Sequence, residues 1–343
     1  MADRQSAPRA VVFGCAGPSL DARERQFFRD ADPLGFILFA RNVDTPDRLR
    51  RLTAELRDCV GRADAPVLID QEGGRVARLR PPHWRAAPAA ARFGTLHGRD
   101  RGFAAEAVRL NARLVADELR GLGISVNCAP VLDLAVAGAH EAIGDRAFSR
   151  HPEAVASLGR ALCEGMLAGG VLPVIKHIPG QGRAGVDGHV RLPVVDAPLI
   201  ELRTLDFAPF RALADMPWAM TAHVLYRAVD ASDPATHSRP LIDTVIRGAI
   251  GFDGVLVSDD LAMAALSGPA DARAAGALAA GCDLALHCNG VLEEMRSVAA
   301  AVGRLSAPGQ ARVARAAARV QAPVAGFEPG AALARLNTLL AAA

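Results

Sequence analysis

Aromatic residues and long apolar runs are scarce in this chain of 343 residues. It has one tyrosine and two tryptophans, and aromatic side chains amount to only 4% of the sequence. No uncharged apolar run approaches the roughly 18 residues that a membrane-spanning helix needs, and the formal charge of +2 is spread along the chain without a basic block. We therefore expect a protein without a membrane span and without a nucleic-acid partner.

Closely spaced cysteines are also missing. The six cysteines include no Cys-x-x-Cys pair, and most of them lie within apolar stretches. Buried free thiols in a reducing compartment fit this pattern better than disulfides or a structural zinc site do. Residues 10–15 form an apolar run that is too short for a secretory signal, and we interpret it as a first strand. We expect a cytoplasmic protein without a metal.

Strand-like apolar runs alternate with helical stretches along the whole chain. Eight such runs occupy residues 10–15, 35–39, 66–70, 124–129, 172–177, 218–223, 255–259 and 282–287. Apolar residues near helical spacing fill most of the gaps, at residues 21–31, 46–59, 102–121, 151–170, 201–215 and 241–250. Eight parallel βα units in about 250 to 300 residues match one closed barrel. The predicted fold class is α/β, a single (β/α)8 TIM barrel that forms one domain over residues 1–343.

A doubly wound nucleotide-binding sheet is the alternative arrangement of strands and helices. It would require Gly-x-Gly-x-x-Gly after the first strand, and Gly14-Cys-Ala-Gly17 does not supply that motif.

Polar residues close most of the apolar runs, which a purely structural strand does not require. They are Asp70, Asn127, Lys176, His177, His223, Ser258, Asp259 and His287. In a parallel barrel the carboxyl ends of the strands form one face, and that face holds the active site. The clearest case is the run 255–259, which ends in two adjacent carboxylates, Asp259 and Asp260, before a helix-like stretch at 261–266. We expect Asp260 to cap that helix.

The segment after the fifth run is long, rich in glycine and rich in titratable groups. It extends over residues 176–193 and contains four glycines from Gly180 to Gly188. Such a loop over a barrel mouth is typical of a functional lid. A phosphate cradle is the alternative interpretation, but the Gly-Lys-Ser/Thr ending of that motif is missing.

Five motifs give the chain a family resemblance. They are Asp70-Gln-Glu-Gly-Gly-Arg-Val76, Ile143-Gly-Asp-Arg-Ala-Phe-Ser149, Lys176-His-Ile-Pro-Gly-Gln-Gly182, Asp187-Gly-His189 and Ser258-Asp-Asp-Leu261. In this order they resemble the family 3 glycoside hydrolases and, within them, the bacterial β-N-acetylglucosaminidases of peptidoglycan recycling. The resemblance spans nearly the whole chain and implies a (β/α)8 barrel, a retaining mechanism and no cofactor.

Two positions depart from the family pattern. Gln181 stands where the family usually has histidine, and Gly188 stands where it usually has serine. Neither change removes a group that the mechanism needs, but the family's resting position of the loop, and any role of the missing imidazole, do not carry over to this chain.

The resemblance places the reacting groups on three residues. Asp259 matches the family nucleophile, and retention needs such a carboxylate beneath the anomeric carbon. The acid/base is implied to be His189, assisted by Asp187. An imidazole titrates near neutrality, so it can give a proton to a leaving oxygen and then take one from water. The alternatives are a buried ion-pair partner for Asp259 and a solvated loop pair for Asp187 and His189.

Six further residues are predicted to bind the sugar: Asp70, Arg78, Arg146, Lys176, His177 and His223. Asp70 would accept bonds from sugar hydroxyls, with Arg78 and Arg146 as its partners. Structural salt bridges are the alternative for both arginines, and a packed core position is the alternative for His223. Lys176 could also form a Schiff base in an aldolase-like barrel. Arg75 is interpreted as structural, and His287, Asn289 and Asp133 receive no assignment.

The predicted function is a retaining exo-β-N-acetylglucosaminidase that acts on cytoplasmic muropeptides with GlcNAc-anhydroMurNAc ends. The scarcity of aromatic residues favours a small pocket for one terminal sugar. We expect a monomer whose partner is a small-molecule carbohydrate. A family 3 β-glucosidase or N-acetylglucosaminide phosphorylase is the nearest alternative. A metal-dependent barrel hydrolase and a non-catalytic sugar-binding barrel are more distant.

Overall fold

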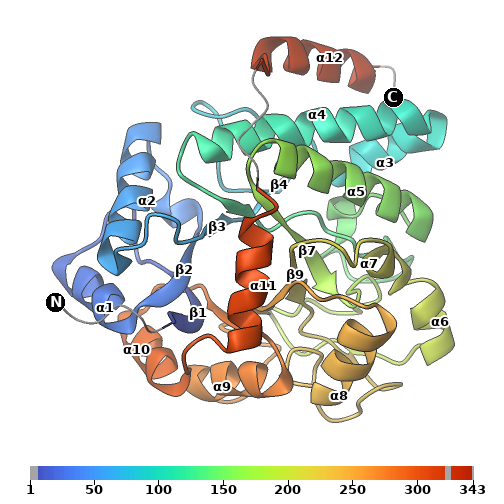
Figure 1. Cartoon of the computed structure of the whole chain (residues 1–343). Helices are drawn as coiled ribbons and strands as arrows, with labels where there is room; N and C mark the ends of the chain where they lie inside the picture. Colours follow the sequence, from blue (N-terminus) through green and yellow to red (C-terminus); the bar gives the residue numbers. More distant parts are fainter. Residues whose placement is uncertain (1–6, 321–325, 342–343) are drawn as a thin grey trace.

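The computed structural model describes residues 7–320 and 326–341, and it is a closed barrel of parallel strands surrounded by helices (Figure 1). Around the barrel the strands follow the order β1-β12-β11-β9-β7-β6-β3-β2. They are β1 (Arg9–Gly14), β2 (Pro33–Leu38), β3 (Val67–Ile69), β6 (Val126–Asn127), β7 (Leu172–Ile178), β9 (Trp218–Thr221), β11 (Val255–Asp260) and β12 (Leu284–His287). Each strand lies within or overlaps one predicted run, and the (β/α)8 barrel is confirmed.

Helices follow the barrel strands and pack around them. The longer ones are α1 (Ala22–Ala31), α2 (Pro46–Val60), α3 (Ala90–Arg99), α4 (Arg101–Arg120), α5 (Pro152–Ala168), α9 (Ala270–Ala280), α10 (Leu292–Ala301), α11 (Ala307–Ala317) and α12 (Pro329–Ala341). The shorter ones are α6 (Leu199–Thr204), α7 (Ala208–Ala212), α8 (Arg239–Leu241), the 3₁₀ turns η1 (Ala40–Asn42) and η2 (Gly144–Arg146), and a π-helix, η3 (Ile242–Ala249). None of the described helices is both long and apolar enough to cross a bilayer.

Two small sheets lie outside the barrel. An antiparallel hairpin of β4 (Gln71–Gly73) and β5 (Val76–Ala77) directly follows β3. The second sheet pairs β8 (Val194–Val195) with β10 (Leu225–Tyr226) in parallel, after the long loop that leaves β7. Both sheets follow the carboxyl ends of barrel strands, where they hold the backbone of the loops.

Alternation along the strands separates the barrel interior from the helix layer. In β1, Val12 belongs to the interior cluster, whereas Val11 and Phe13 belong to the large cluster between the strands and the helices. Leu305, at the start of the segment that leads into α11, and Ala316 within α11 pack against the interior cluster. Helix α11 therefore closes the amino end of the barrel, and it crosses the middle of the view in Figure 1.

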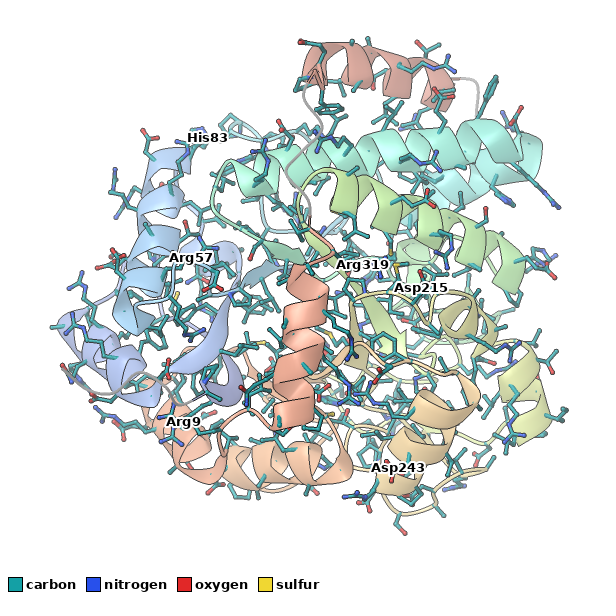
Figure 2. All side chains as sticks on the ribbon, viewed as in Figure 1. Arg9, Arg57, His83, Asp215, Asp243 and Arg319 are labelled. Atoms are coloured by element: carbon teal, nitrogen blue, oxygen red, sulfur yellow. The ribbon has the colours of Figure 1, made fainter. Side chains whose placement is uncertain are left out.

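The end of α11 is tied to the chain just before β9. The guanidinium of Arg319 donates a hydrogen bond of 2.6 Å to the carbonyl oxygen of Asp215, and both residues are labelled in Figure 2.

The six cysteines are all buried and free, as the sequence predicts.

Two predicted helices are wrong in detail. The stretch 201–215 is split into α6 and α7, because Pro209 cannot donate the backbone hydrogen bond that a continuing helix needs. The stretch 261–266 forms turns. There the Asp260 carboxylate accepts the N–H groups of both Ala262 and Cys288, and Arg273 binds the carbonyl oxygens of Leu261 and Met263. Asp260 thus caps a turn and the end of β12, and it caps no helix.

Phe28 is a sensitive position of the helix layer. Its ring is fully buried and contacts the rings of Phe27 and Phe36, with centroids 5.4 and 5.1 Å away. We expect Phe28→Ala to lower the free energy of unfolding by about 3 to 5 kcal/mol, because it removes buried apolar surface and leaves a cavity. Urea unfolding measures this change. Phe103→Ala is the matched control, since Phe103 is 43% exposed and should cost about 1 kcal/mol or less; equal losses would contradict the packing described.

Candidate active site

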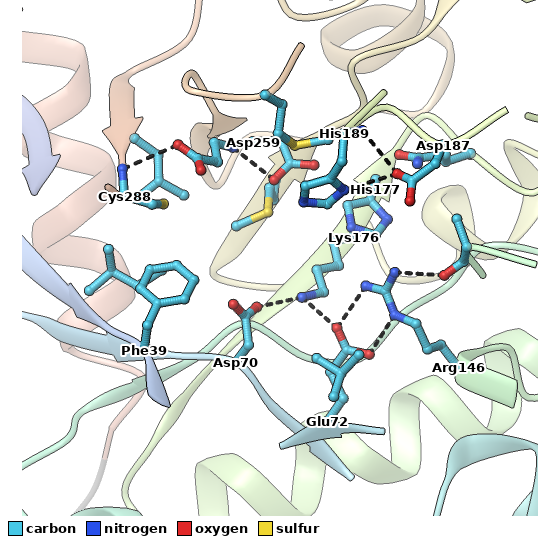
Figure 3. A pocket seen from close by; sticks show the side chains of 18 of the residues that line it. Phe39, Asp70, Glu72, Arg146, Lys176, His177, Asp187, His189, Asp259 and Cys288 are labelled. Atoms are coloured by element: carbon cyan, nitrogen blue, oxygen red, sulfur yellow. Dashed lines mark hydrogen bonds and ion pairs between the residues drawn. The ribbon is translucent and has the colours of Figure 1, made fainter. Parts of the chain in front are cut away.

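A cavity of about 300 Å³ opens at the carboxyl ends of the barrel strands (Figure 3). This volume is at the lower end of the range for small-ligand sites, about 300 to 1,000 Å³. Eight of the nine predicted site residues line it: Asp70, Arg78, Arg146, Lys176, His177, Asp187, His189 and Asp259. The structure therefore brings together residues that lie up to 189 positions apart in the sequence. Their individual roles stay predictions.

Asp259 lies at the end of β11, where the strand delivers it to the cavity. One carboxylate oxygen accepts the N–H of Asp260 at 2.8 Å. Burial raises the pKa of Asp259, but nearby His177 and His223 lower it by more than burial raises it. The net pKa therefore lies below the usual value for aspartate. Burial also raises the pKa of the neighbouring Asp260, and there it prevails, so the net pKa of Asp260 is raised. Of the two adjacent carboxyl groups, Asp259 is therefore the one whose anionic form its surroundings favour.

His189 and Asp187 form a pair on the loop that follows β7. The Nδ1 atom of His189 lies 2.9 Å from Oδ1 of Asp187, and the same oxygen accepts the His189 backbone N–H at 2.9 Å. Burial raises the pKa of Asp187, while these hydrogen bonds lower it to a net value below the usual one. The imidazole is 74% exposed and still lines the cavity. The carboxylate therefore fixes one ring nitrogen and leaves the other free for substrate.

Gly188, one of the two departures from the family pattern, lies where the loop contacts a neighbouring turn. Its carbonyl oxygen accepts the N–H of Ala265 at 2.9 Å, which ties the loop to the turn after β11. A Cβ atom at position 188 would lie 2.9 Å from the terminal methyl carbon of Met263. This distance is below normal van der Waals contact, so a side chain at position 188 would require the flexible end of Met263 to move.

A buried ionic cluster occupies the opposite wall of the cavity. Lys176 lies 2.7 Å from both Asp70 and Glu72. Arg78 binds Asp70 at 3.1 Å, whereas Arg146 forms two bonds of 2.8 Å to Glu72. The prediction that Arg146 pairs with Asp70 is therefore wrong, because Glu72 lies between them in the cluster (Figure 3).

Charges within this cluster compensate for burial. Burial raises the pKa of Glu72, but Lys176 and Arg146 lower it to about 2 overall. Lys176 and Arg78 likewise hold the pKa of Asp70 well below its usual range despite burial. Burial lowers the pKa of Lys176, yet the two carboxylates raise it above its usual value, so Lys176 stays charged. An amine held in this way is a poor Schiff-base nucleophile.

Sequence reasoning missed Glu72, although a signal was present. Residues 70 and 72 lie two positions apart across the start of an extended hairpin, so their side chains point to the same side. Arg75 was predicted to be structural, and it binds Asp145 at 2.8 Å together with the carbonyl oxygens of residues 141–143. It also lines the cavity, so it braces the loop before η2 at the cavity's edge.

His223 does not line the cavity, contrary to the prediction. It is 1% exposed, and its ring nitrogens lie 2.7 Å from the Thr236 hydroxyl and 3.0 Å from the carbonyl oxygen of Asp260. Burial lowers its pKa. Because both nitrogens already have protein partners, His223 supports the backbone beside Asp259 and cannot also bind a sugar. Within the described residues, no group of three or more His, Cys, Asp or Glu side chains is arranged to hold a metal ion.

His177 reaches the cavity from the end of β7. Its Nδ1 atom lies 2.6 Å from Oδ2 of Asp133, a residue that receives no assignment from sequence alone. The other oxygen of Asp133 accepts the backbone N–H of Gln181 at 2.6 Å. Gln181 itself is buried and lines the cavity in place of the usual family histidine.

Glu72→Gln tests whether the buried ionic cluster contributes more to the free energy of unfolding than an ordinary surface ion pair does. We expect a loss of about 3 kcal/mol or more in the free energy of unfolding at neutral pH, because Arg146 and Lys176 lose a buried counter-charge. The loss should shrink as the pH falls toward 2, where Glu72 itself becomes protonated, since a lowered carboxylate pKa stabilises only above it. Urea unfolding across pH measures both effects. Asp145→Asn, which breaks an exposed pair, should cost at most about 1 kcal/mol; an equal cost would contradict the cluster's role.

Known proteins match nearly the whole chain. Residues 19–322 match the Glycosyl hydrolase family 3 N terminal domain. A beta-hexosaminidase from Methylococcus capsulatus is 40% identical over 305 residues, which cover 88% of this chain and 89% of that protein. NagZ from Neisseria gonorrhoeae, solved in complex with N-trifluoroacetyl-D-glucosamine, superposes with a TM-score of 0.81 and 33% identity over 98% of this chain and 99% of that one.

A larger relative has the same barrel. The structure of a glycoside hydrolase family 3 beta-N-acetylglucosaminidase from Paenibacillus sp. str. FPU-7 matches with a TM-score of 0.85 and 30% identity. The match covers 96% of this chain but only 66% of that protein. The domain match, the sequence identity and the shared barrel agree, and the chain belongs to glycosyl hydrolase family 3.

Proposed function

We propose that the protein is a retaining exo-β-N-acetylglucosaminidase that forms one catalytic barrel over residues 1–343. The observation that carries the proposal is the arrangement of two reactive groups around one cavity. An ionised carboxylate, Asp259, lies at the end of β11, and a carboxylate-bound imidazole, His189, faces the same space from the loop after β7. Retaining hydrolysis needs such a nucleophile together with a separate proton donor.

The reaction would take place in two steps. Asp259 attacks the anomeric carbon and forms an ester bond to the sugar, while protonated His189 gives its proton to the glycosidic oxygen as the bond to the aglycone breaks. A water molecule then attacks the same carbon, His189 takes a proton from that water, and the carboxylate of Asp259 is released. Two inversions at one carbon give overall retention. No step requires a cofactor.

The substrate class follows from the relatives and the cavity size. The Methylococcus protein is a beta-hexosaminidase, and the Neisseria structure holds an N-acylated glucosamine. A cavity of about 300 Å³ suits one terminal sugar. The ionic cluster of Asp70, Lys176 and Arg78 would bind its hydroxyl groups. We propose that the aglycone is the anhydro-muramic end of cytoplasmic muropeptides, and that the protein acts as a monomer.

Two assays test this proposal. Nitrophenyl β-N-acetylglucosaminide should be hydrolysed far faster than the β-glucoside, and purified GlcNAc-anhydroMurNAc should release free N-acetylglucosamine. Proton NMR of the first product should show the β-anomer before mutarotation. The α-anomer as first product would exclude the retaining mechanism, and a preference for the glucoside would exclude the proposed substrate class.

Transfer to phosphate is a second candidate reaction, favoured by one feature of the site. The acid/base is a neutral or cationic imidazole, which does not repel a phosphate anion as a second carboxylate would. In a phosphorylase, phosphate would replace water in the second step and give a glycosyl phosphate. Product analysis with and without inorganic phosphate decides between the two reactions.

A further inference from the structure

The segment after β6 carries a buried carboxylate, Asp133, that the two catalytic steps do not use. Its side chain is fully buried and does not line the cavity. Oδ2 lies 2.6 Å from Nδ1 of His177, while Oδ1 accepts the backbone N–H of Gln181 at 2.6 Å and that of His177 at 3.3 Å. A buried charge is costly unless it is paired. All the bonds of this carboxylate go to the end of β7 and to the base of the loop that carries Asp187 and His189.

Backbone pairing fixes Asp133 in this position. Val131 forms a parallel bridge with Lys176, and the N–H of Leu132 donates to the Lys176 carbonyl at 2.7 Å. One residue further along, Asp133 therefore stands beside His177. Beyond it, a Cβ atom on Gly182 would lie 2.3 Å from the carbonyl oxygen of Leu134, so only glycine permits this approach. The two segments are thus packed backbone to backbone around the carboxylate.

We propose that Asp133 is a positioning residue that holds the His177 imidazole with Nδ1 protonated and Nε2 available to the cavity, and that anchors the base of the acid/base loop. A carboxylate can only accept hydrogen bonds, so Nδ1 of His177 must be the donor. The ring cannot rotate without leaving a buried charge unpaired. This inference rests on the proposed glycosidase function.

Asp133 is the group that links the ring to the loop base. The same base is also held by Tyr226, whose hydroxyl donates to the Gly180 carbonyl at 2.7 Å, and by Arg183, which binds Asp206 at 2.8 Å. Neither of these contacts touches His177. The loop therefore has an anchored base and an exposed outer part that carries His189, and Asp133 sets the base relative to the cavity wall.

The pKa of Asp259 should depend on the position of His177. Of the neighbouring groups, His177 lowers the pKa of Asp259 most, against the effect of burial. Other charged or titratable groups around these two side chains come from every neighbouring segment: Asp70, Glu72, Arg146, Lys176, Asp206, His223, Tyr226 and Asp260. Asp133 itself raises the pKa of Arg146, Asp206 and Tyr226, whereas His177 is the group through which a change at position 133 would reach Asp259.

Asp133→Asn tests the proposal because the amide has one acceptor oxygen. If that oxygen keeps its bond to the Gln181 N–H, the NH₂ group faces Nδ1 of His177, and the ring must carry its proton on Nε2. Aspartate-to-asparagine changes of this kind leave the geometry intact but select the wrong tautomer. The matched control is Asp206→Asn, which changes another buried loop-anchoring carboxylate that does not touch His177.

Two measurements give separate readouts. Nitrogen-15 chemical shifts of labelled histidine, with the His177 signal identified by its loss in His177→Gln, show which ring nitrogen carries the proton. We expect Nδ1 in the wild type and in Asp206→Asn, and Nε2 in Asp133→Asn. We also expect kcat/KM for nitrophenyl β-N-acetylglucosaminide to fall about tenfold to a hundredfold in Asp133→Asn, by analogy with carboxylates that orient metal-binding histidines. The acidic limb of its pH profile should move to higher pH.

The outcomes are distinct. A wild-type His177 without a proton on Nδ1 would overturn the proposal, and this spectrum needs no variant that might fail to fold. An active wild type with an unchanged pH profile in Asp133→Asn would also overturn it. Wild-type inactivity toward the glycoside would refute the proposed function instead, and the tautomer would still decide the role of Asp133.

Discussion

Asp259→Asn is expected to lower kcat by at least about 10⁴-fold, because the amide cannot form the ester to the anomeric carbon. Asparagine has nearly the size of aspartate and can still accept the N–H of Asp260, so the strand end should keep its structure. The pKa of Asp259 lies below the usual value, so this proposed nucleophile is ionised at neutral pH in the wild type, and the anion is lost only as the pH falls through that lowered pKa. Steady-state release of nitrophenol, with unfolding curves for both proteins, measures the effect.

Asp260→Asn is the matched control for this variant. Asp260 is the adjacent carboxyl group and lines the same cavity, but its raised pKa and its bonds to two backbone N–H groups assign it a structural role. We expect its kcat to stay within about tenfold of the wild type. If instead Asp260→Asn abolished turnover and Asp259→Asn retained it, the two roles would have to be exchanged.

The barrel could be predicted because each strand carries its own local signal. The run 255–259 is apolar and β-branched, and it ends abruptly in carboxylates, so both its strand character and its position at the active face can be read from neighbouring residues. The turns at 261–266, by contrast, could not be told from a helix by neighbouring residues alone. The backbone groups of this segment bind Arg273, Gly188 and the Asp260 carboxylate, and these contacts form only in the folded chain.

The same distinction applies within the site. Asp259, Asp187 and His189 lie in short motifs, and the resemblance located them directly. Asp133 lies 44 residues before His177, and only the pairing of two backbone segments brings them together. His223 follows the end of a strand as the cavity residues do. Its ring, however, binds the hydroxyl of Thr236, which lies 13 residues later in a loop, and so does not face the cavity. Side-chain direction at a strand end is set by such partners, which a single sequence does not reveal.

His189→Ala should give an effect whose size depends on the leaving group. Nitrophenolate departs without protonation, so the first step should be little changed, whereas an alkyl aglycone such as an anhydro-muramic sugar needs the proton. We expect kcat/KM for GlcNAc-anhydroMurNAc, the proposed substrate, to fall about 10²- to 10⁴-fold, and kcat/KM for the nitrophenyl glycoside to fall much less. The second step lacks its base in both cases, so a burst of nitrophenol followed by slow turnover should appear.

Azide makes this prediction specific to acid/base chemistry. It is a small nucleophile that needs no deprotonation, so it should attack the trapped glycosyl-enzyme in His189→Ala and restore nitrophenol turnover as a β-glycosyl azide. Val190→Ala is the matched control, because Val190 is the next residue of the same loop, is 72% exposed and should behave as the wild type. Loss of activity in His189→Ala that is equal for both leaving groups and insensitive to azide would assign His189 to binding or loop structure. Asp187→Asn should then show the same leaving-group dependence in weaker form if the carboxylate acts only through the imidazole it holds.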